Sequence, residues 1–436
     1  MSGEKPREIA LRVLQRRGGQ AFIEDTLEAE LQHVRLSSRD RGLCQELVYG
    51  VVRWQALLDW FIASKTDPSR PQKPLLQNLL RLGLYQILFL DRIPNHAAVH
   101  ETVEIARRRG LLPQSGFLNA VFRAFLRELD QTKAGLADLK KTQPHLAYSH
   151  PEWLAKRWEH RWGREKTSEL MTWNNTPPKT FARINTLKAD PAKLLEQWRH
   201  EDVIYDFFSR DWIEQNLIFE LKEHPPLARL PSFQQGLFYI QDPSTLLAVS
   251  FLDPKPGEIL LDLCAAPGGK LTFIAQVIHD QGRLIAHDLN ETRRKLISEN
   301  CRRLGITCVQ SALPADFESP QASRNKIPDR FDRILVDAPC SNTGVMRRRV
   351  DLRWRIRPEE IQRLRDSQLS LLRTAERRLK PGGTLVYSTC SLEPEENQGV
   401  IETFLREFPR LKLEAARELL PFADGVDGAY VARLRG

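Results

Sequence analysis

The sequence predicts an α/β protein in which a mostly parallel, doubly wound sheet follows a small α+β domain and an all-helical domain. Apolar residues recur at helical spacing through residues 1–135, whereas short helices and strands mix in residues 145–235. Strand-like and helical segments alternate through residues 236–436, as expected of a parallel sheet. A chain of 436 residues is long enough for two or three domains with separate cores.

The first domain is predicted to contain several amphipathic helices, including residues 97–108 and 117–129. The apolar stretch 75–90 is interrupted by polar residues and is short for a membrane span of roughly 20 residues, so we expect a buried helix. Residues 132–143 are rich in Lys, Thr and Gln, which favours a linker after this domain.

The middle domain is predicted to combine short helices and short strands. Residues 153–162 are expected to form a helix and residues 179–186 a strand. Residues 223–231 contain three prolines, which indicates turns.

The last domain supplies the strands of the main sheet. They are predicted at residues 259–263, 284–288, 307–310, 331–337 and 384–388. Helices are predicted to begin near Leu271, Glu291, Pro358 and Pro394. Residues 428–434 are expected to return as a last, antiparallel edge strand.

The composition is ordinary for a globular protein in water, with 41% hydrophobic and 28% charged residues. The formal net charge of +9 suits a polyanionic partner such as RNA. The six cysteines include no CxxC pair, so zinc-ligand spacing is absent and reduced thiols in the cytosol are the simpler interpretation. No apolar signal core and no transmembrane segment is predicted. We therefore expect a cytoplasmic, monomeric protein that needs neither a membrane nor a metal.

A glycine-containing turn follows the first predicted strand of the main sheet. Gly268 and Gly269 lie in Asp-Leu-Cys-Ala-Ala-Pro-Gly-Gly-Lys, residues 262–270, where backbone N–H groups can approach a carboxylate or phosphate. Asp288 ends the next strand about 20 residues later, where a carboxylate commonly accepts ribose hydroxyls. Because GxxxxGK[ST] and GxGxxG are both absent, S-adenosylmethionine fits better than ATP or NAD. The alternative is a plain tight turn, with Asp288 and Lys270 in solvent.

A cysteine follows each of two further predicted strands. Cys340 lies in Asp-Ala-Pro-Cys-Ser, residues 337–341, and Cys390 lies in Ser-Thr-Cys-Ser, residues 388–391. Ligands and chemistry gather at the carboxyl ends of parallel strands in open α/β sheets. Two thiol nucleophiles beside a nucleotide-type cofactor suggest covalent catalysis on an electrophilic ring. The alternative is a buried, inert cysteine, which suits the other four better. Position alone does not say which of the two is the nucleophile.

Arginine is dense in residues 346–357, directly after the Cys340 turn. Guanidinium groups pair with phosphates, and Trp354 can stack on a base, so this run favours a nucleic-acid contact. A solvated charged face is the alternative.

Three motifs, at residues 262–270, 337–341 and 388–391, resemble in sequence and order those of the Sun-type RNA cytosine-5 methyltransferases. Pro394-Glu395-Glu396-Asn397 and Arg183-Ile184-Asn185 also match that family. The N-terminal region resembles the NusB-type RNA-binding domain, notably at residues 97–103 and 117–121. The resemblance covers nearly the whole chain and points to the bacterial 16S ribosomal RNA enzymes of the Sun/Fmu type.

This resemblance implies three domains and one reaction. Residues 236–436 would be a Rossmann-like, S-adenosylmethionine-dependent methyltransferase domain, and residues 1–135 a NusB-like RNA-binding domain. Residues 145–235 would be a small α+β domain that binds RNA or links the other two. The enzyme would methylate C5 of a cytosine in 16S ribosomal RNA through a covalent cysteine–C6 adduct.

The resemblance also implies roles for individual residues. Cys390 would attack C6 of cytosine, Cys340 would assist release of the product, and Asp337 would hydrogen-bond the target base. S-adenosylmethionine would be held by Cys264, Ala265, Ala266, Pro267, Gly268, Gly269, Lys270, Asp288 and Asp337. The sequence departs from the family after the third strand, where an acidic residue is usual and the first carboxylate here is that of Asp316.

Two other functions remain open at this point. The chain is either an enzyme acting on transfer RNA or a catalytically inactive RNA-binding protein of ribosome assembly. Both retained cysteines and the glycine turn argue against the inactive protein, and the NusB-like region favours ribosomal RNA by resemblance.

Overall fold

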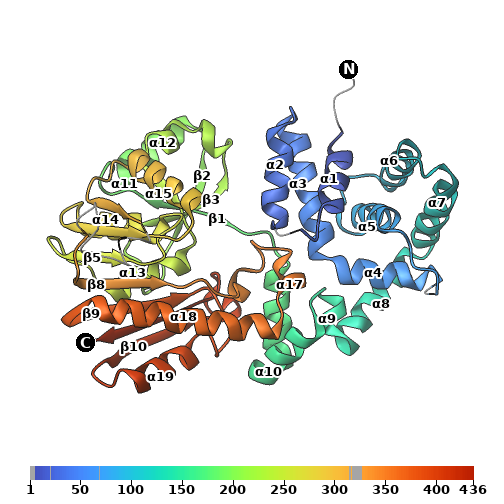
Figure 1. Cartoon of the computed structure of the whole chain (residues 1–436). Coiled ribbons are helices and arrows are strands. Elements are labelled where there is room, and N and C mark those ends of the chain that lie inside the picture. Colours follow the sequence, from blue (N-terminus) through green and yellow to red (C-terminus); the bar gives the residue numbers. More distant parts are fainter. Residues whose placement is uncertain (1–4, 20, 68, 314–315, 317–326) are drawn as a thin grey trace. The chain divides into compact units, whose positions relative to one another are not determined.

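The structure is a computed structural model that describes residues 5–19, 21–67, 69–313, 316 and 327–436 (Figure 1). The chain forms two compact units. The helical unit contains Met1–Pro177 together with Met346–Arg355, and the sheet unit contains Pro178–Val345 and Ile356–Gly436. The division into three domains at residues 135, 145 and 235 stays a prediction.

The described part of the helical unit contains helices and no strands, as predicted for residues 1–135. The helices are α1 (Pro6–Gln15), α2 (Ile23–Gln32), α3 (Ser38–Arg53), α4 (Gln55–Ser64), α5 (Pro74–Phe89), α6 (Asn95–Arg108), α7 (Leu112–Arg127), α8 (Leu129–Thr142), α9 (Pro144–Ala147), α10 (Glu152–Asn174) and α17 (Leu352–Arg355). The buried apolar faces of α1 to α9 form one core. The predicted helices at residues 75–90, 97–108 and 117–129 are confirmed as α5, α6 and α7.

Two glycines bring helices of this unit close together. A Cβ atom on Gly50 in α3 would lie 1.9 Å from Cζ of Tyr85, and one on Gly83 in α5 would lie 2.2 Å from Cζ of Phe122. Only glycine leaves room for these aromatic rings, because real Cβ atoms do not approach other atoms so closely.

The prediction of a linker at residues 132–143 is wrong, because most of these residues lie in α8. Leu139 is buried, and Leu129 and Leu136 pack against the core of the helical unit. A leucine stripe at helical spacing therefore outweighs the polar composition of the other positions. The predicted helix at residues 153–162 is confirmed, and it continues as α10 after a break at Gly163, which has a φ of 78°.

The sheet unit begins with a small antiparallel sheet of order β2-β3-β1-β4. Its elements are β1 (Thr180–Ile184), β2 (Ile204–Phe208), β3 (Ile218–Glu223), β4 (Phe238–Ile240), α11 (Pro191–His200), α12 (Pro231–Gln234) and the 3₁₀ helix η1 (Leu227–Arg229). Trp198 of α11 is fully buried, and its ring meets those of Phe219 and Phe238 edge-on at centroid distances of 5.4 Å. The predicted strand at residues 179–186 is confirmed as β1.

The main sheet has seven strands in the order β10-β11-β9-β8-β5-β6-β7. They are β5 (Ile259–Asp262), β6 (Arg283–His287), β7 (Val309–Ala312), β8 (Phe331–Asp337), β9 (Leu379–Thr389), β10 (Lys412–Leu419) and β11 (Ala429–Arg435). The five from β5 to β9 are parallel to one another. Each coincides with a predicted strand, although β7 begins two residues later than expected.

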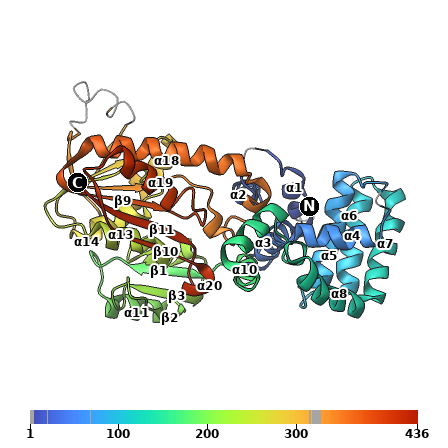
Figure 2. The ribbon, with the colours of Figure 1, turned by 90° about the horizontal axis from the view of Figure 1, so that it is seen from below.

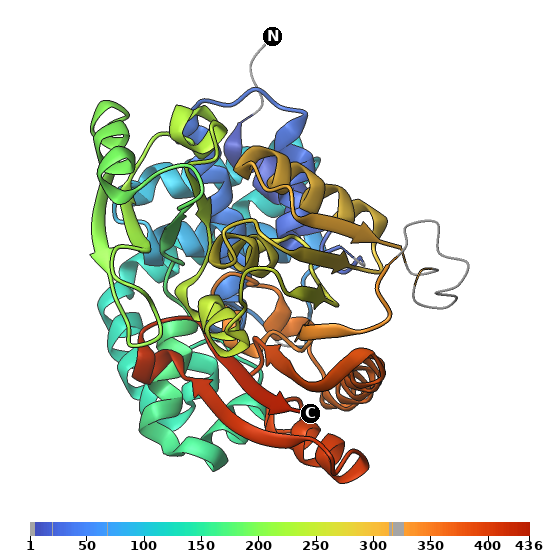
Figure 3. The same cartoon turned by 90° about the vertical axis from the view of Figure 1, so that its left-hand side faces the viewer.

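The last strand, β11, is antiparallel as predicted but is not the edge of the sheet. It pairs with β9 on one side and with β10 on the other, so β10 is the edge (Figure 3). The strand β10 has mostly exposed side chains, which removed the hydrophobic signal that would have predicted it.

Helices cover both faces of the main sheet, which confirms the doubly wound architecture (Figure 2). One face packs on α13 (Leu246–Leu252), α14 (Gly269–Val277) and α15 (Glu291–Leu304). The other face packs on α18 (Pro358–Arg378) and α19 (Gln398–Glu407). The remaining elements are η2 (Pro243–Thr245), η4 (Thr343–Val345) and α20 (Pro421–Asp424).

Part of the arginine-rich run is not an exposed nucleic-acid contact. Arg347 and Arg353 are buried inside the helical unit, with 2% and 0% of their surfaces exposed. The guanidinium of Arg347 stacks on Trp173 at 4.0 Å, and the indole N–H of Trp354 donates to the carbonyl of Val52. The hypothesis of RNA contact is therefore wrong for the two buried arginines, because their guanidinium groups fix the fold.

No helix within the described ranges is long and apolar enough to cross a membrane.

Candidate active site

The loops of the predicted site lie at one edge of the main sheet. The strands β6, β5, β8 and β9 are consecutive neighbours and parallel, so their carboxyl ends share that edge. The glycine loop (residues 263–270) follows β5, Asp288 follows β6, the Cys340 turn follows β8 and the Cys390 turn follows β9. The structure therefore brings together the site residues that were predicted from three separate motifs.

The glycine loop is built for a close backbone approach. Gly268 has a φ of 107°, a conformation that side chains disfavour, and it directly precedes α14. Of the other loop residues, Ala265 and Ala266 are buried, Cys264 is partly exposed and Pro267 is exposed. Burial, with the nearby Asp262 carboxyl group, raises the pKa of Cys264 well above its usual value. Cys264 therefore keeps its proton at neutral pH, and its thiol is part of the loop surface rather than a nucleophile.

Arg183 holds the glycine loop from the small sheet. Its guanidinium donates to the carbonyl of Gly269 at 2.9 Å, to Oγ1 of Thr272 at 3.0 Å and to the side chain of Gln241. Burial lowers the pKa of Arg183 to about 9, so it remains a cation at neutral pH. The motif Arg183-Ile184-Asn185 was visible in the sequence, but this positioning role was not.

Asn185 makes a second link of the same kind. Its side-chain amide donates to the carbonyl of Gly236 at 2.8 Å and to that of Leu304, at the end of α15, at 2.9 Å. Arg183 in β1 and Asn185 directly after it therefore hold the glycine loop and the helix that follows Asp288.

Asp288 is buried and is held by main-chain groups. Its carboxylate accepts hydrogen bonds from the N–H of Ala266 at 3.2 Å and from that of Asn290 at 3.0 Å. Arg293 lies 3.8 Å away as a salt-bridge partner. The alternative of a freely solvated Asp288 is therefore wrong, since only 6% of the residue is exposed.

An ion pair connects the glycine loop to the Cys340 strand. Nζ of Lys270 lies 2.7 Å from Oδ2 of Asp337, and the hydroxyl of Ser388 donates to Oδ1 of Asp337 at 2.8 Å. Burial acts to lower the pKa of Lys270, but the Asp337 carboxylate outweighs it and the net shift is upward. Lys270 is therefore a fixed cation between the glycine loop and the Cys340 turn.

Asp262, at the end of β5, is a buried carboxyl group beside this ion pair. Burial raises its pKa to about 8, and the neighbouring Asp337 adds to the shift while Lys270 opposes it. The site thus holds one carboxyl group that is protonated at neutral pH.

The two predicted thiols lie side by side. Sγ of Cys340 is 3.3 Å from Sγ of Cys390. Cys340 is buried, with 7% of its surface exposed, whereas Cys390 is partly exposed. The hydrogen bond with Cys390, together with burial, raises the pKa of Cys340 well above its usual value. The pair therefore combines one accessible sulfur with one thiol that keeps its proton.

Glu396 forms hydrogen bonds with both the Cys340 turn and the Cys390 turn. Its carboxyl group accepts from the N–H of Ser341 at 2.9 Å, from the Ser391 hydroxyl at 2.5 Å and from the Gln368 amide at 2.9 Å. Burial raises the pKa of Glu396. The sequence shows Glu396 within a matching motif, but nothing in one sequence shows that its side chain reaches both turns.

Asp316 is the first carboxylate after the third strand. It is buried, and its carboxylate accepts the N–H of Leu313 at 2.8 Å. Within the described ranges, no group of His, Cys, Asp and Glu side chains has the arrangement of a metal site.

Comparison with known proteins assigns each part of the chain. Residues 249–435 match the family model for the 16S rRNA methyltransferase RsmB/F. Residues 4–127 match the NusB family, and residues 150–214 match the ferredoxin-like domain of the RsmF/B-like methyltransferases. These matches confirm the predicted fold classes of all three segments.

Individual relatives cover nearly the whole chain. The probable ribosomal RNA small subunit methyltransferase B of Bacillus subtilis is 36% identical over 98% of both chains. The ribosomal RNA small subunit methyltransferase B of Klebsiella pneumoniae is 35% identical over 92% of this chain and 91% of its own. The solved structure of a methyltransferase homolog from Pyrococcus horikoshii has a TM-score of 0.58 at 30% identity, over 67% of this chain and 97% of its own.

The doubly wound sheet and the loops at its carboxyl edge define a Rossmann-like methyltransferase. The chain belongs to the RsmB/F family of 16S rRNA methyltransferases.

Proposed function

We propose that this protein transfers a methyl group from S-adenosylmethionine to C5 of a cytosine in 16S ribosomal RNA, through a covalent bond between Cys390 and C6. The observation that carries the proposal is the pair of thiols 3.3 Å apart at the ends of β8 and β9. A methyl transfer to oxygen or to an exocyclic nitrogen needs no thiol. Carbon C5 of cytosine is a poor nucleophile and needs one.

The residues of the glycine loop fit S-adenosylmethionine. Gly268 and Gly269 expose backbone at the start of α14, and Asp288 offers a carboxylate held at the end of β6. Lys270 and the loop residues Cys264, Ala265, Ala266 and Pro267 would line the same ligand. When bound, S-adenosylmethionine supplies an electrophilic methyl group on a sulfonium.

The reaction follows from the thiols and the base. Cys390, as a thiolate, adds to C6 and forms an S–C6 bond, while the displaced ring electrons make C5 nucleophilic. C5 then takes the methyl group. Its proton passes to a water molecule, the C5–H electron pair restores the C5–C6 double bond, and the S–C6 bond breaks with its electron pair returning to sulfur. The protonated Cys340 is placed to hydrogen-bond the departing sulfur, which supports its role in release. Asp337, held by Lys270 and Ser388, would hydrogen-bond the base.

The target base must leave its stack to reach Cys390. The relatives named as small-subunit ribosomal RNA methyltransferases support 16S ribosomal RNA as the substrate.

The test is to map 5-methylcytosine in the ribosomal and transfer RNA of a strain that lacks this gene. Loss of one 5-methylcytosine from 16S ribosomal RNA, restored by the wild-type gene and not by a Cys390→Ala copy, is the expected result. Loss from a transfer RNA instead would replace the substrate, and an unchanged map would contradict the proposal.

A further inference from the structure

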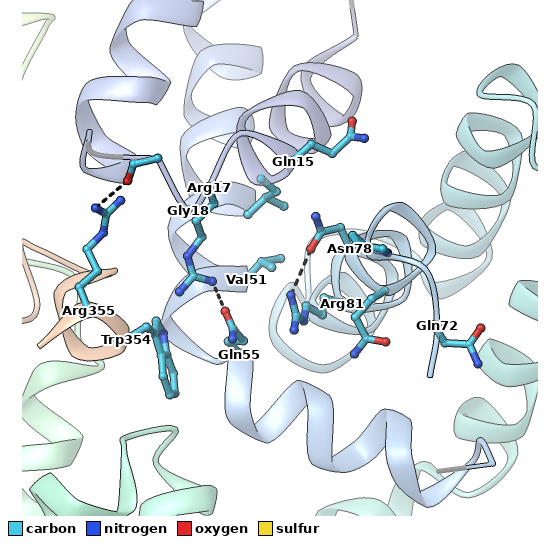
Figure 4. Close-up of a pocket in the computed structure, with 14 residues that line it drawn as sticks. Gln15, Arg17, Gly18, Val51, Gln55, Gln72, Asn78, Arg81, Trp354 and Arg355 are labelled. Carbon is cyan, nitrogen blue, oxygen red and sulfur yellow. Dashed lines mark hydrogen bonds between the residues drawn. The ribbon is translucent and has the colours of Figure 1, made fainter. Parts of the chain in front are cut away.

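The helical unit contains a pocket that is lined by residues between Leu14 and Arg81 and by Trp354 and Arg355. Its volume is about 680 Å³, and it is lined by the end of α1, the start of α4, the first turns of α5 and the helix α17 (Figure 4). The side chains that give it its chemistry are Arg17, Gln55, Gln72, Arg81, Trp354 and Arg355.

Three arginine side chains line the pocket. Arg17 lies in the turn after α1, Arg81 lies in α5 and Arg355 ends α17, and no Asp or Glu lines the cavity. Arg81 is paired with Asp59 at 2.7 Å and Arg355 with Asp351 at 2.8 Å, outside the lining. Three cations against two carboxylates leave the pocket with an excess of positive charge.

Among the described residues, Arg17 differs from the other two cations in having no carboxylate within salt-bridge distance. In the described part of the chain it forms a hydrogen bond to Gln55 and no salt bridge. Burial lowers the pKa of Arg17 to about 10, while Asp351 acts in the opposite direction, so the guanidinium is protonated at neutral pH. A half-buried cation that faces a cavity with N–H donors left over is suited to an anion, most of all a phosphate oxygen.

The rest of the lining suits a base rather than a simple ion. Trp354 is partly exposed in the pocket, and its indole N–H is used by the carbonyl of Val52 at 2.8 Å, which fixes the ring. Aromatic rings stack with bases of single-stranded nucleic acid. The amides of Gln55 and Gln72 provide both donors and acceptors, which base edges require.

We propose that this pocket binds one unpaired nucleotide of the RNA substrate, with its phosphate on Arg17 and its base against Trp354. The inference rests on the proposed function, since it assigns a second contact of that RNA, separate from the methylated cytosine. A nucleotide is favoured over a protein partner because the lining contains three guanidinium groups, several side-chain amides and no carboxylate.

The test compares Arg17→Gln with Arg16→Gln in the full-length protein. Arg16 is the neighbouring residue, is exposed and pairs with Glu30 instead of facing the pocket, so its loss removes the same charge from the same region. The probe is 16S ribosomal RNA transcribed without modification. Melting temperatures and S-adenosylmethionine affinities of both variants should equal those of the wild type.

We expect Arg17→Gln to raise the Kd for the RNA about tenfold, as for the loss of one charge-assisted contact, and Arg16→Gln by less than about twofold. The dependence of log Kd on log salt should become shallower by about one unit for Arg17→Gln. Arg17→Lys should restore most of the affinity. At saturating RNA the methylation rate should remain that of the wild type, because the pocket does not take part in the chemistry.

A second measurement examines the base. RNA containing 4-thiouridine should cross-link under light to the peptide that carries Trp354, and Arg17→Gln should weaken that cross-link. Equal RNA affinities and equal salt slopes for the Arg17 and Arg16 variants would contradict nucleotide binding in this pocket and would leave the proposed function intact. Unchanged RNA binding with lost binding of a ribosomal protein would make the pocket a protein site. A wild-type enzyme that fails to methylate 16S ribosomal RNA would remove the proposed function itself.

Discussion

The thiol of Cys390 donates a hydrogen bond to Oδ1 of Asn342, with 3.0 Å between the two atoms. The amide nitrogen of Asn342 in turn donates to the carbonyl of Cys340 at 2.7 Å. Asn342 has a φ of 57°, a left-handed conformation that asparagine adopts more readily than most residues. One asparagine thus connects the two thiol turns, and it orients the accessible sulfur before RNA is bound.

We expect Cys390→Ala to abolish methyl transfer and to leave S-adenosylmethionine affinity within about twofold of the wild type. Cys390 follows β9, whereas the glycine loop follows β5, so the loss of its sulfur removes a bond-forming atom and no cofactor contact. Calorimetry and a methyl-transfer assay on the same sample measure both. Cys308→Ala, at a thiol before β7, is the control and should keep its activity. Substantial methylation by Cys390→Ala would show that another group is the nucleophile.

Cys340→Ser is expected to accumulate a covalent RNA–protein adduct through Cys390. The buried Cys340 thiol lies 3.3 Å from the sulfur of Cys390, which is the leaving group in the proposed reaction, so its loss should stall the enzyme between methyl transfer and release. A band of reduced mobility on a denaturing gel, sensitive to ribonuclease, reports the adduct. The double variant Cys340→Ser, Cys390→Ala should show no band. An adduct formed by Cys390→Ala alone would exchange the two roles.

Asp288→Ala should weaken S-adenosylmethionine binding by about tenfold or more, since a hydrogen bond to a charged group contributes roughly 1.5–3 kcal/mol. RNA affinity should change little. Because Asp288 also accepts the N–H of Ala266, Asp288→Asn is a useful companion that keeps an acceptor for the loop and removes the charge. Titration calorimetry measures the S-adenosylmethionine affinity of both variants. An unchanged affinity in both would mean that Asp288 does not bind the ribose.

The sequence predicted the parallel sheet and the four loops of the site because strand-end motifs are local in the chain. It did not predict contacts made by distant side chains. Arg353 looks like a phosphate contact in a row of arginines, yet its acceptors lie between residues 53 and 175. Glu396 and Arg183 are similar cases, since each positions a loop that is remote in sequence or lies in another sheet. Burial of a charge depends on such partners, and a single sequence does not specify them.

The protonated Asp262 predicts a specific pH dependence of stability. Its pKa is about 8 in the folded protein, because of burial and the nearby Asp337, and about 4 in an unfolded chain. As the pH rises between these values, the unfolded chain loses a proton that the folded protein keeps. The contribution of Asp262 to stability is therefore complete below pH ~4 and falls by as much as about 1.4 kcal/mol per pH unit up to pH ~8.

Asp262→Asn lacks this titration. Thermal melts of both proteins between pH 5 and 8 should show the wild type losing stability relative to the variant as the pH rises. Comparing the two proteins at each pH removes the contribution of the other titrating groups. A difference in melting temperature that is constant over this range would mean that Asp262 is ionised in the folded protein.

Arg353 is expected to stabilise the helical unit rather than to bind RNA. It is fully buried, and its guanidinium donates to the carbonyls of Ser149 and Asn174 at 3.1 and 3.0 Å and to Oδ1 of Asn175 at 2.7 Å. Arg353→Ala would leave these oxygens buried without a donor, at a cost of about 3 kcal/mol or more. For a unit of this size the melting temperature should fall by roughly 6–12 °C.

Two further variants separate this effect from a loss of charge. Arg353→Lys should recover only part of the stability, because an ammonium group does not reproduce the planar fork that serves several oxygens. Arg357→Ala, at an exposed arginine four residues later, should change the stability by less than about 0.5 kcal/mol. If Arg353→Ala instead melted like the wild type and bound 16S ribosomal RNA more weakly, the arginine would be an RNA contact. The packing of residues 346–355 into the helical unit would then not be the stabilising interaction that its hydrogen bonds indicate.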